Sequence, residues 1–266
     1  MGYTFGIPEY ALNGSSLVRL SDDALKCVVF LGSEFGDDIV LAGTGFLVVD
    51  GKAPNQTIYV VTASHVARGL DGAPIGVRLN TKDGGFRVQP IDRPDWVHHV
   101  DENVDVTALI FDPPAWADVT VYSTAFFATD GKMETKNFGP GDFAYVAGLY
   151  RILRDTRRNI PIVHTGHVAA LVSDHPLPVT DPVSGLVRHA HGYLVESRAI
   201  SGASGSPVFV RRSIKHNILD PDAPGKGLRA VTSGSVWLLG LWQASWPMEP
   251  DMNLIEGVNL PKDVKV

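Results

Sequence analysis

Residues 43–65 read GTGFLVVDGKAPNQTIYVVTASH, two apolar runs separated by a polar stretch. Val, Ile, Phe and Tyr dominate both runs, which is typical of β-strands, and Asp50-Gly51 is a turn signal between them. His65 follows the second run directly, and Thr62 or Ser64 could cap a short helical turn there. The segment therefore predicts two strands with an imidazole held at the end of the second one.

Short apolar runs bounded by turn residues continue along most of the chain. They predict strands at residues 26–31, 39–49, 57–63, 75–80, 105–111, 142–149, 162–172, 191–195, 207–211 and 235–243. Short helices are expected only at 16–24 and 252–255. The 27 glycines and 18 prolines argue against a helix bundle, and few stretches are long enough for the helices of a βαβ repeat. The predicted fold class is all-β, a sandwich or a barrel.

The composition is that of a globular chain with enough apolar material for a core, at 44% hydrophobic and 20% charged residues. A net charge of −6 disfavours a general nucleic-acid binder. No apolar run is long enough to cross a bilayer, and residues 1–10 lack the pattern of a signal peptide. Cys27 is the single cysteine, so no internal disulfide can form. We therefore expect a cytoplasmic protein with neither a membrane nor a nucleic acid as partner.

A second segment that carries chemistry is DENVDVTALIF at residues 101–111. Asp105 directly precedes an apolar run, so its carboxylate would be partly buried and would need a partner. The imidazole N–H of His65 would satisfy that carboxylate and fix the tautomer of the ring. Two alternatives remain: Asp105 is a solvated aspartate at a strand end, or Asp101, outside the strand, is the relevant carboxylate.

The third segment, ISGASGSPVFV at residues 200–210, surrounds a serine with small residues. Glycines allow backbone conformations denied to other residues, so the N–H groups of Gly202 and Ser204 could form an oxyanion hole beside the Ser204 hydroxyl. Ser201 and Ser206 are competing nucleophiles, and Ser206 ranks lower because the proline after it restricts its backbone. A tight turn without a catalytic role is the alternative for the whole segment.

Together, the three segments resemble the trypsin-like serine peptidases of the chymotrypsin fold, which carry a triad in the order His, Asp, Ser. His65 follows Thr-Ala-Ser where the family has Thr-Ala-x, and Asp105 leads a run similar to the family's Asp-x-Ala-Leu with one extra residue. Ser204 lies in Gly-Ala-Ser-Gly-Ser-Pro, where the family has Gly-x-Ser-Gly-Gly-Pro. The resemblance implies two packed six-stranded antiparallel β-barrels, with His65, Asp105 and Ser204 as catalytic residues and the N–H groups of Gly202 and Ser204 as the oxyanion hole.

Further stretches look closest to the bacterial, disulfide-free, HtrA-like branch of that family. These stretches are YVAG at 145–148, TGHVA at 165–169, LLGLW at 238–242 and GVNLP at 257–261. The resemblance implies an N-terminal extension over 1–24 and a peptidase domain over 25–262. Within that domain we expect a first barrel at about 25–112, a crossover at about 113–141 and a second barrel at about 142–262, with no PDZ domain after it.

The same resemblance suggests where the substrate side chain before the scissile bond would bind. The family builds this pocket from residues shortly before the nucleophile and from the strand after it, here Arg198, Ile200, Gly240 and Trp242. An inward-pointing Arg198 would favour an acidic substrate residue, whereas a solvated Arg198, or one paired with Glu196, would not. Ala203 stands where zymogen-activated members have an aspartate, so activation by N-terminal cleavage is not expected.

The predicted function is therefore that of a serine endopeptidase acting on polypeptides without a metal or an organic cofactor. His164 and His167 would point to opposite faces of a strand, and no carboxylate or cysteine spacing completes a metal site with any close histidine pair. The alternative is a catalytically silent or latent protein of the same fold, which binds or scaffolds and requires a regulatory protein partner. An α/β-hydrolase is disfavoured because Gly-x-Ser-x-Gly and the order Ser, Asp, His are both missing.

Overall fold

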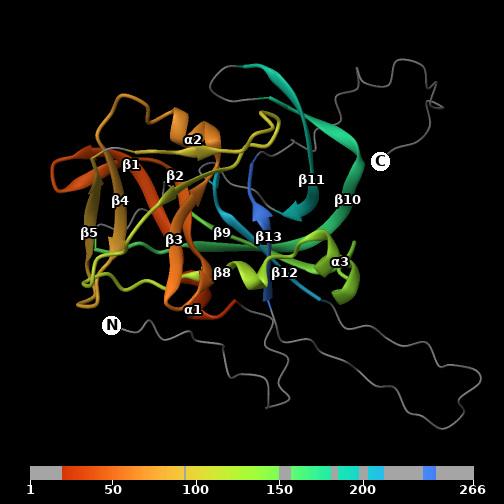
Figure 1. Ribbon diagram of the computed structural model, residues 1–266, viewed down its shortest axis with the longest axis horizontal. Helices are drawn as coiled ribbons and strands as arrows, with labels where there is room; N and C mark the ends of the chain where they lie inside the picture. The colour runs from red at the N-terminus through yellow and green to blue at the C-terminus, as the bar shows by residue number, and fades with distance from the viewer. Residues whose placement is uncertain are drawn as a thin grey trace, which may run out of the picture.

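β-Strands make up most of the structure (Figure 1), a computed structural model that describes residues 20–92, 94–149, 157–180, 185–197, 203–212 and 236–243. The first sheet contains β1 (Val28–Phe35), β2 (Asp38–Lys52), β3 (Asn55–Thr62), β4 (Ile75–Asn80), β5 (Phe86–Ile91), β6 (Val97–His98), β7 (Thr107–Ile110) and β8 (Tyr122–Ser123). The second sheet contains β9 (Phe143–Gly148), β10 (Ile162–Thr180), β11 (Val187–Ser197), β12 (Pro207–Arg211) and β13 (Val236–Leu241). The predicted all-β class is confirmed.

Strand order explains how the two sheets correspond to a chymotrypsin-like double barrel. The first sheet runs β5-β4-β1-β2-β3-β7-β6, with the two-residue β8 added parallel to β2. The second sheet runs β11-β10-β9-β12-β13, with antiparallel neighbours throughout. Six strands of the first sheet have four or more residues. The strand expected at 257–261 lies outside the described residues, and the expected domain bounds stay predictions.

Side chains along a strand point alternately to its two faces and so contribute to three apolar cores, one within each sheet and one between the sheets. On β1, Val29 and Leu31 enter the core of the first sheet, whereas Val28 and Phe30 face the second sheet. Phe209 of β12 meets them from the other side. Because successive side chains of a strand point to opposite faces, strands buried on both faces read as continuous apolar runs. This packing brings the segments of the candidate site together at the junction of the sheets.

Several elements differ from the sequence-based predictions. β5 was not predicted: its residues alternate between apolar and polar without forming an apolar run, and Pro90 fits a strand at the edge of the sheet, which is the position of β5. Three short helices also form: α1 (Asp22–Leu25), α2 (Ser64–Arg68) and α3 (Asp130–Lys136), with a 3-10 turn η1 (Thr124–Phe126). α1 overlaps the helix expected at 16–24, whereas the one expected at 252–255 lies outside the described residues. α3 ends at Asn137, whose left-handed backbone (φ 53°) stops it.

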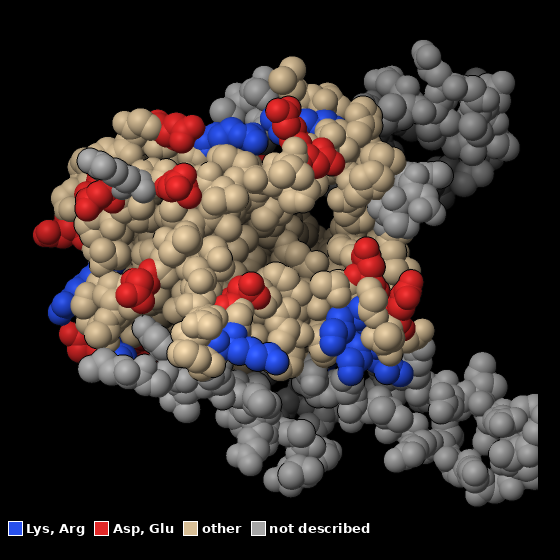
Figure 2. All heavy atoms as spheres, in the orientation of Figure 1, with Lys and Arg blue, Asp and Glu red and all other residues tan. Residues whose placement is uncertain are grey.

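The hairpin formed by β10 and β11 is much longer than predicted and reaches back to the first sheet. Near its base, Asn159 exchanges hydrogen bonds with β4, accepting from the buried Arg78 guanidinium (2.5 Å) and donating to the Arg78 carbonyl (2.7 Å). Farther along, Arg188 donates to the Glu102 carbonyl and the His189 amide donates to Asn103 (3.4 Å). The hairpin therefore arches from one sheet to the other, and the surface is hollowed beside it (Figure 2). Among the described residues, no helix has the length and apolar character needed to span a bilayer.

Candidate active site

His65 lies on α2, the short helix that begins directly after β3. The buried Ala63 is the N-cap of this helix, and no side chain caps it. The expectation that Thr62 or Ser64 caps the turn is therefore wrong. The Thr62 hydroxyl instead donates to the Thr44 carbonyl (2.7 Å), and the Ser64 hydroxyl pairs with His98 Nδ1 (3.2 Å).

Asp105 holds His65 through its side chain and through its backbone. The carboxylate contacts His65 Nδ1 at 2.5 Å and accepts a hydrogen bond from the His65 backbone N–H at 2.9 Å. The carbonyl of Asp105 also accepts from the Ser64 N–H at 3.3 Å. Both side chains are 8% exposed, so water does not compete strongly for these contacts. Nδ1 thus faces the carboxylate, which leaves Nε2 as the ring nitrogen available to a substrate or nucleophile.

Asp101, the alternative carboxylate, belongs to a separate exposed loop. Its side chain accepts hydrogen bonds from the backbone N–H of Asn103 (2.9 Å) and from the side-chain amide of the same residue (3.0 Å). These hydrogen bonds, led by the backbone one, lower the pKa of the Asp101 carboxyl group below its ordinary value. Asp101 therefore shapes its own loop, and Asp105 is the carboxylate that meets the histidine.

Ser204 sits in a tight turn that packs against the segment carrying His65. The turn closes through a hydrogen bond from the Ser206 N–H to the Ala203 carbonyl (2.8 Å), with Gly205 in the left-handed region at φ 82°. A Cβ on Gly205 would lie 2.1 Å from the Thr44 carbonyl and 2.4 Å from the Thr62 hydroxyl, so only glycine allows this approach. The first glycine after Ser204 is therefore required by the contact with the end of β3.

Burial distinguishes Ser204 from Ser206, one of the two other serines that the sequence offers as candidate nucleophiles. Ser206 is fully buried, and its hydroxyl lies where a Cβ on Gly148 would be 1.7 Å away. A substrate cannot reach such a hydroxyl, whereas Ser204 is partly exposed. Ser206 is therefore a packing residue whose side chain occupies space left by Gly148. The other competitor, Ser201, lies outside the described residues, as does Gly202 of the predicted oxyanion hole.

Thr44 joins the turn that carries Ser204 to β3 and to the end of β9, although the sequence indicated it only as part of the run Gly43-Thr44-Gly45. Its N–H donates to the Ser204 carbonyl (3.0 Å), and its carbonyl accepts from the Thr62 hydroxyl. Its own hydroxyl oxygen accepts from the Leu149 N–H at the end of β9 (2.8 Å). Thr44 is fully buried, so these contacts fix the Ser204 turn relative to both sheets. The feature of the sequence that could have indicated its role is its position between two glycines, Gly43 and Gly45.

The residues predicted to line the substrate side-chain pocket are only partly described. Trp242 lies beside the Ser204 turn, since its carbonyl accepts from the Gly205 N–H (2.9 Å) and its N–H donates to the Ser206 carbonyl (2.8 Å). Gly240 is exposed, and a Cβ there would meet no atom within 4 Å. Arg198 and Ile200 lie outside the described residues. Within the described chain, no group of three or more His, Cys, Asp or Glu residues is arranged to hold a metal ion.

Residues 43–213, more than half of the chain, match a family model described as a trypsin-like peptidase domain. Among solved structures, the chain is similar to the crystal structure of the Rv3671c protease in an inactive form. That likeness has a TM-score of 0.39 and 18% sequence identity, and it covers 69% of this chain and 71% of the other. No curated protein sequence matches the chain.

Proposed function

The chain belongs to the trypsin-like peptidase family, and on that premise we propose that it is a serine endopeptidase. The observation that carries the proposal is the pairing of His65 with Asp105, through both the ring nitrogen and the backbone N–H. A buried carboxylate that orients an imidazole beside a partly exposed serine turn is the arrangement needed for nucleophilic acyl transfer.

The proposed mechanism assigns one role to each of these groups. The Ser204 hydroxyl oxygen attacks the carbonyl carbon of a substrate peptide bond while His65 Nε2 takes the hydroxyl proton. The same proton then goes to the leaving amine, which breaks the C–N bond and leaves an acyl ester on Ser204. Water, deprotonated by His65, hydrolyses the ester and regenerates the hydroxyl. Asp105 stabilises the imidazolium in both steps.

The N–H groups of Gly202 and Ser204 are proposed to bind the oxyanion that forms on the carbonyl oxygen. The backbone of Trp242, at the end of the second sheet, supports this proposal because its two hydrogen bonds hold the turn that presents the Ser204 N–H. We keep Arg198, Ile200, Gly240 and Trp242 as the proposed lining of the pocket for the substrate side chain. Polypeptides are the proposed substrates; an HtrA-like relationship and a cytoplasmic location also remain proposals.

Labelling with a fluorophosphonate, which reacts covalently with activated serines, tests this assignment. The purified protein should be labelled, and Ser204→Ala or His65→Ala should abolish labelling because the nucleophile or its base is lost. Ser206→Ala is the matched control: it removes a serine hydroxyl two residues away that is fully buried, so labelling should persist.

Two results would contradict the proposal. Labelling that survives in Ser204→Ala would place the nucleophile elsewhere. A folded wild-type protein that is never labelled would favour the other function class, a silent or latent protein that binds a partner through this fold.

A further inference from the structure

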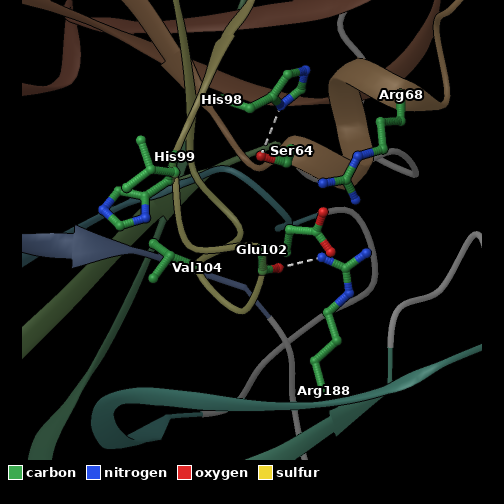
Figure 3. A pocket seen from close by; sticks show the side chains of 8 residues that line it. Ser64, Arg68, His98, His99, Glu102, Val104 and Arg188 are labelled. Atoms are coloured by element: carbon green, nitrogen blue, oxygen red, sulfur yellow. Dashed lines mark hydrogen bonds between the residues drawn. The ribbon is translucent and has the colours of Figure 1, made fainter.

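A pocket of about 370 Å³ lies beside the segments that carry His65 and Asp105. Its lining comes from α2, from β6 and the loop that joins β6 to β7, and from β11 of the second sheet (Figure 3). Ser64 and Val104, which line it, are the immediate neighbours of His65 and Asp105 in the chain. A group bound in this pocket would therefore lie next to the segments that carry the catalytic base and its partner.

Positive charge exceeds negative charge among the residues that line this pocket. Arg68 of α2 and Arg188 of β11 bring two guanidinium groups to the lining. Glu102 is the one carboxylate among the lining residues. Both arginines point toward Glu102 in Figure 3, and Arg188 donates to the Glu102 backbone carbonyl. This excess stands out in a chain with a net charge of −6.

From this juxtaposition we infer that the pocket between Arg68 and Arg188 binds an acidic side chain of the polypeptide substrate. Guanidinium groups are suited to carboxylates because their donors form a planar fork that matches the two oxygens. Glu102 is exposed, so its side chain can turn toward solvent when a substrate carboxylate takes its place between the arginines. This inference rests on the proposed peptidase function and adds a substrate preference to it.

The preference would differ in origin from the one predicted around Arg198. Arg68 lies on helix α2, which follows β3 of the first sheet, whereas Arg188 lies on β11 of the second sheet. The pocket therefore forms where the β10–β11 hairpin reaches the loop from β6 to β7. The same contacts would let a bound acidic residue tie the hairpin more firmly to the first sheet. Substrate binding and hairpin position should therefore depend on the same two arginines.

Peptide pairs that differ only by Glu against Gln at single positions near the scissile bond test the inference. Hydrogen bonds between charged groups typically change binding by roughly ten- to a hundredfold, so we expect kcat/KM to favour Glu by about tenfold at one position. Arg68→Gln and Arg188→Gln should each reduce that preference, measured as the ratio of kcat/KM for the Glu peptide to kcat/KM for the matched Gln peptide. Glu102→Gln should increase it, because the competing carboxylate is lost.

Arg87→Gln is the matched control, since Arg87 lies over Trp116 and does not line the pocket; it should leave the preference unchanged. A carboxylate in the pocket could come from a Glu side chain or from the C-terminus of a peptide. Peptides with an internal Gln and a free C-terminal carboxylate distinguish these two sources. A preference that follows the chain end and not the Glu side chain would overturn the inference.

Failure of the inference and failure of the proposed function give different results. A protein that reacts with fluorophosphonate and cleaves the peptides, but shows no Glu preference or keeps it in both arginine variants, would overturn the inference alone. A protein that neither reacts nor cleaves would overturn both.

Discussion

Replacing Thr44 by valine tests whether this residue joins the two sheets at the site. Valine keeps the shape of the side chain but removes the hydroxyl oxygen that accepts from the Leu149 N–H at 2.8 Å. Thr44 is fully buried and Leu149 is 4% exposed, so water cannot replace the lost partner. A buried donor left without a partner costs about 1–3 kcal/mol, and we expect the free energy of unfolding to fall by that amount.

Urea unfolding followed by tryptophan fluorescence measures this loss directly. Thermal unfolding should show it as well, because 1 kcal/mol corresponds to a shift in Tm of roughly 2–4 °C in a domain of this size. Thr135→Val is the matched control, since the Thr135 hydroxyl bonds to the Gly131 carbonyl on the exposed side of α3. Its effect should stay within about 0.5 kcal/mol. A Thr44→Val protein as stable as this control would refute the reasoning.

Four further predictions concern the turn around Ser204, the neighbouring Gly148 and the single cysteine. Gly205→Ala should abolish fluorophosphonate labelling, because its Cβ would clash with backbone 2.1 Å away and its φ of 82° disfavours alanine; normal labelling would contradict this reading. Gly148→Ala should destabilise the protein, and Ser206→Gly should restore stability in the double variant, since the two side chains compete for one space; additive losses in urea unfolding would count against it. Burial raises the pKa of the Cys27 thiol to about 12, so iodoacetamide at about pH 8 should modify only the unfolded protein. Because the unfolded thiol ionises near its ordinary pKa of 9.0, the free energy of unfolding should also decrease as pH rises from about 9 to 12, less steeply in Cys27→Ala.

The sequence was sufficient to predict the all-β class and the meeting of His65 with Asp105. Both depended on local signals: apolar runs that alternate with turns, and polar residues placed directly at the ends of such runs. The resemblance to a known family added the double barrel. The strands could be predicted from a few consecutive residues each, whereas the contact of His65 with Asp105, 40 positions away, was inferred from the need of a buried carboxylate for a partner and from the resemblance to the family.

Features that depend on contacts between distant segments were not predictable in the same way. The Thr44–Leu149 hydrogen bond joins residues 105 positions apart, and nothing in the sequence around either residue indicates that the two are partners. The extra length of β10 and β11 follows from their pairing with each other, through register shifts that no local pattern marks. The pocket between Arg68 and Arg188 also depends on this hairpin. The sequence analysis therefore suggested Arg198, but not Arg188, as a residue that would favour acidic substrate side chains.

Cleavage of an unfolded polypeptide such as reduced casein, with the new amino termini identified by mass spectrometry, tests the central claim most directly. The account predicts new termini at internal positions with the wild-type protein and none with Ser204→Ala. Internal cleavage that persists in Ser204→Ala, or a wild-type protein that reacts with fluorophosphonate but cuts no internal peptide bond, would contradict the assignment as a serine endopeptidase.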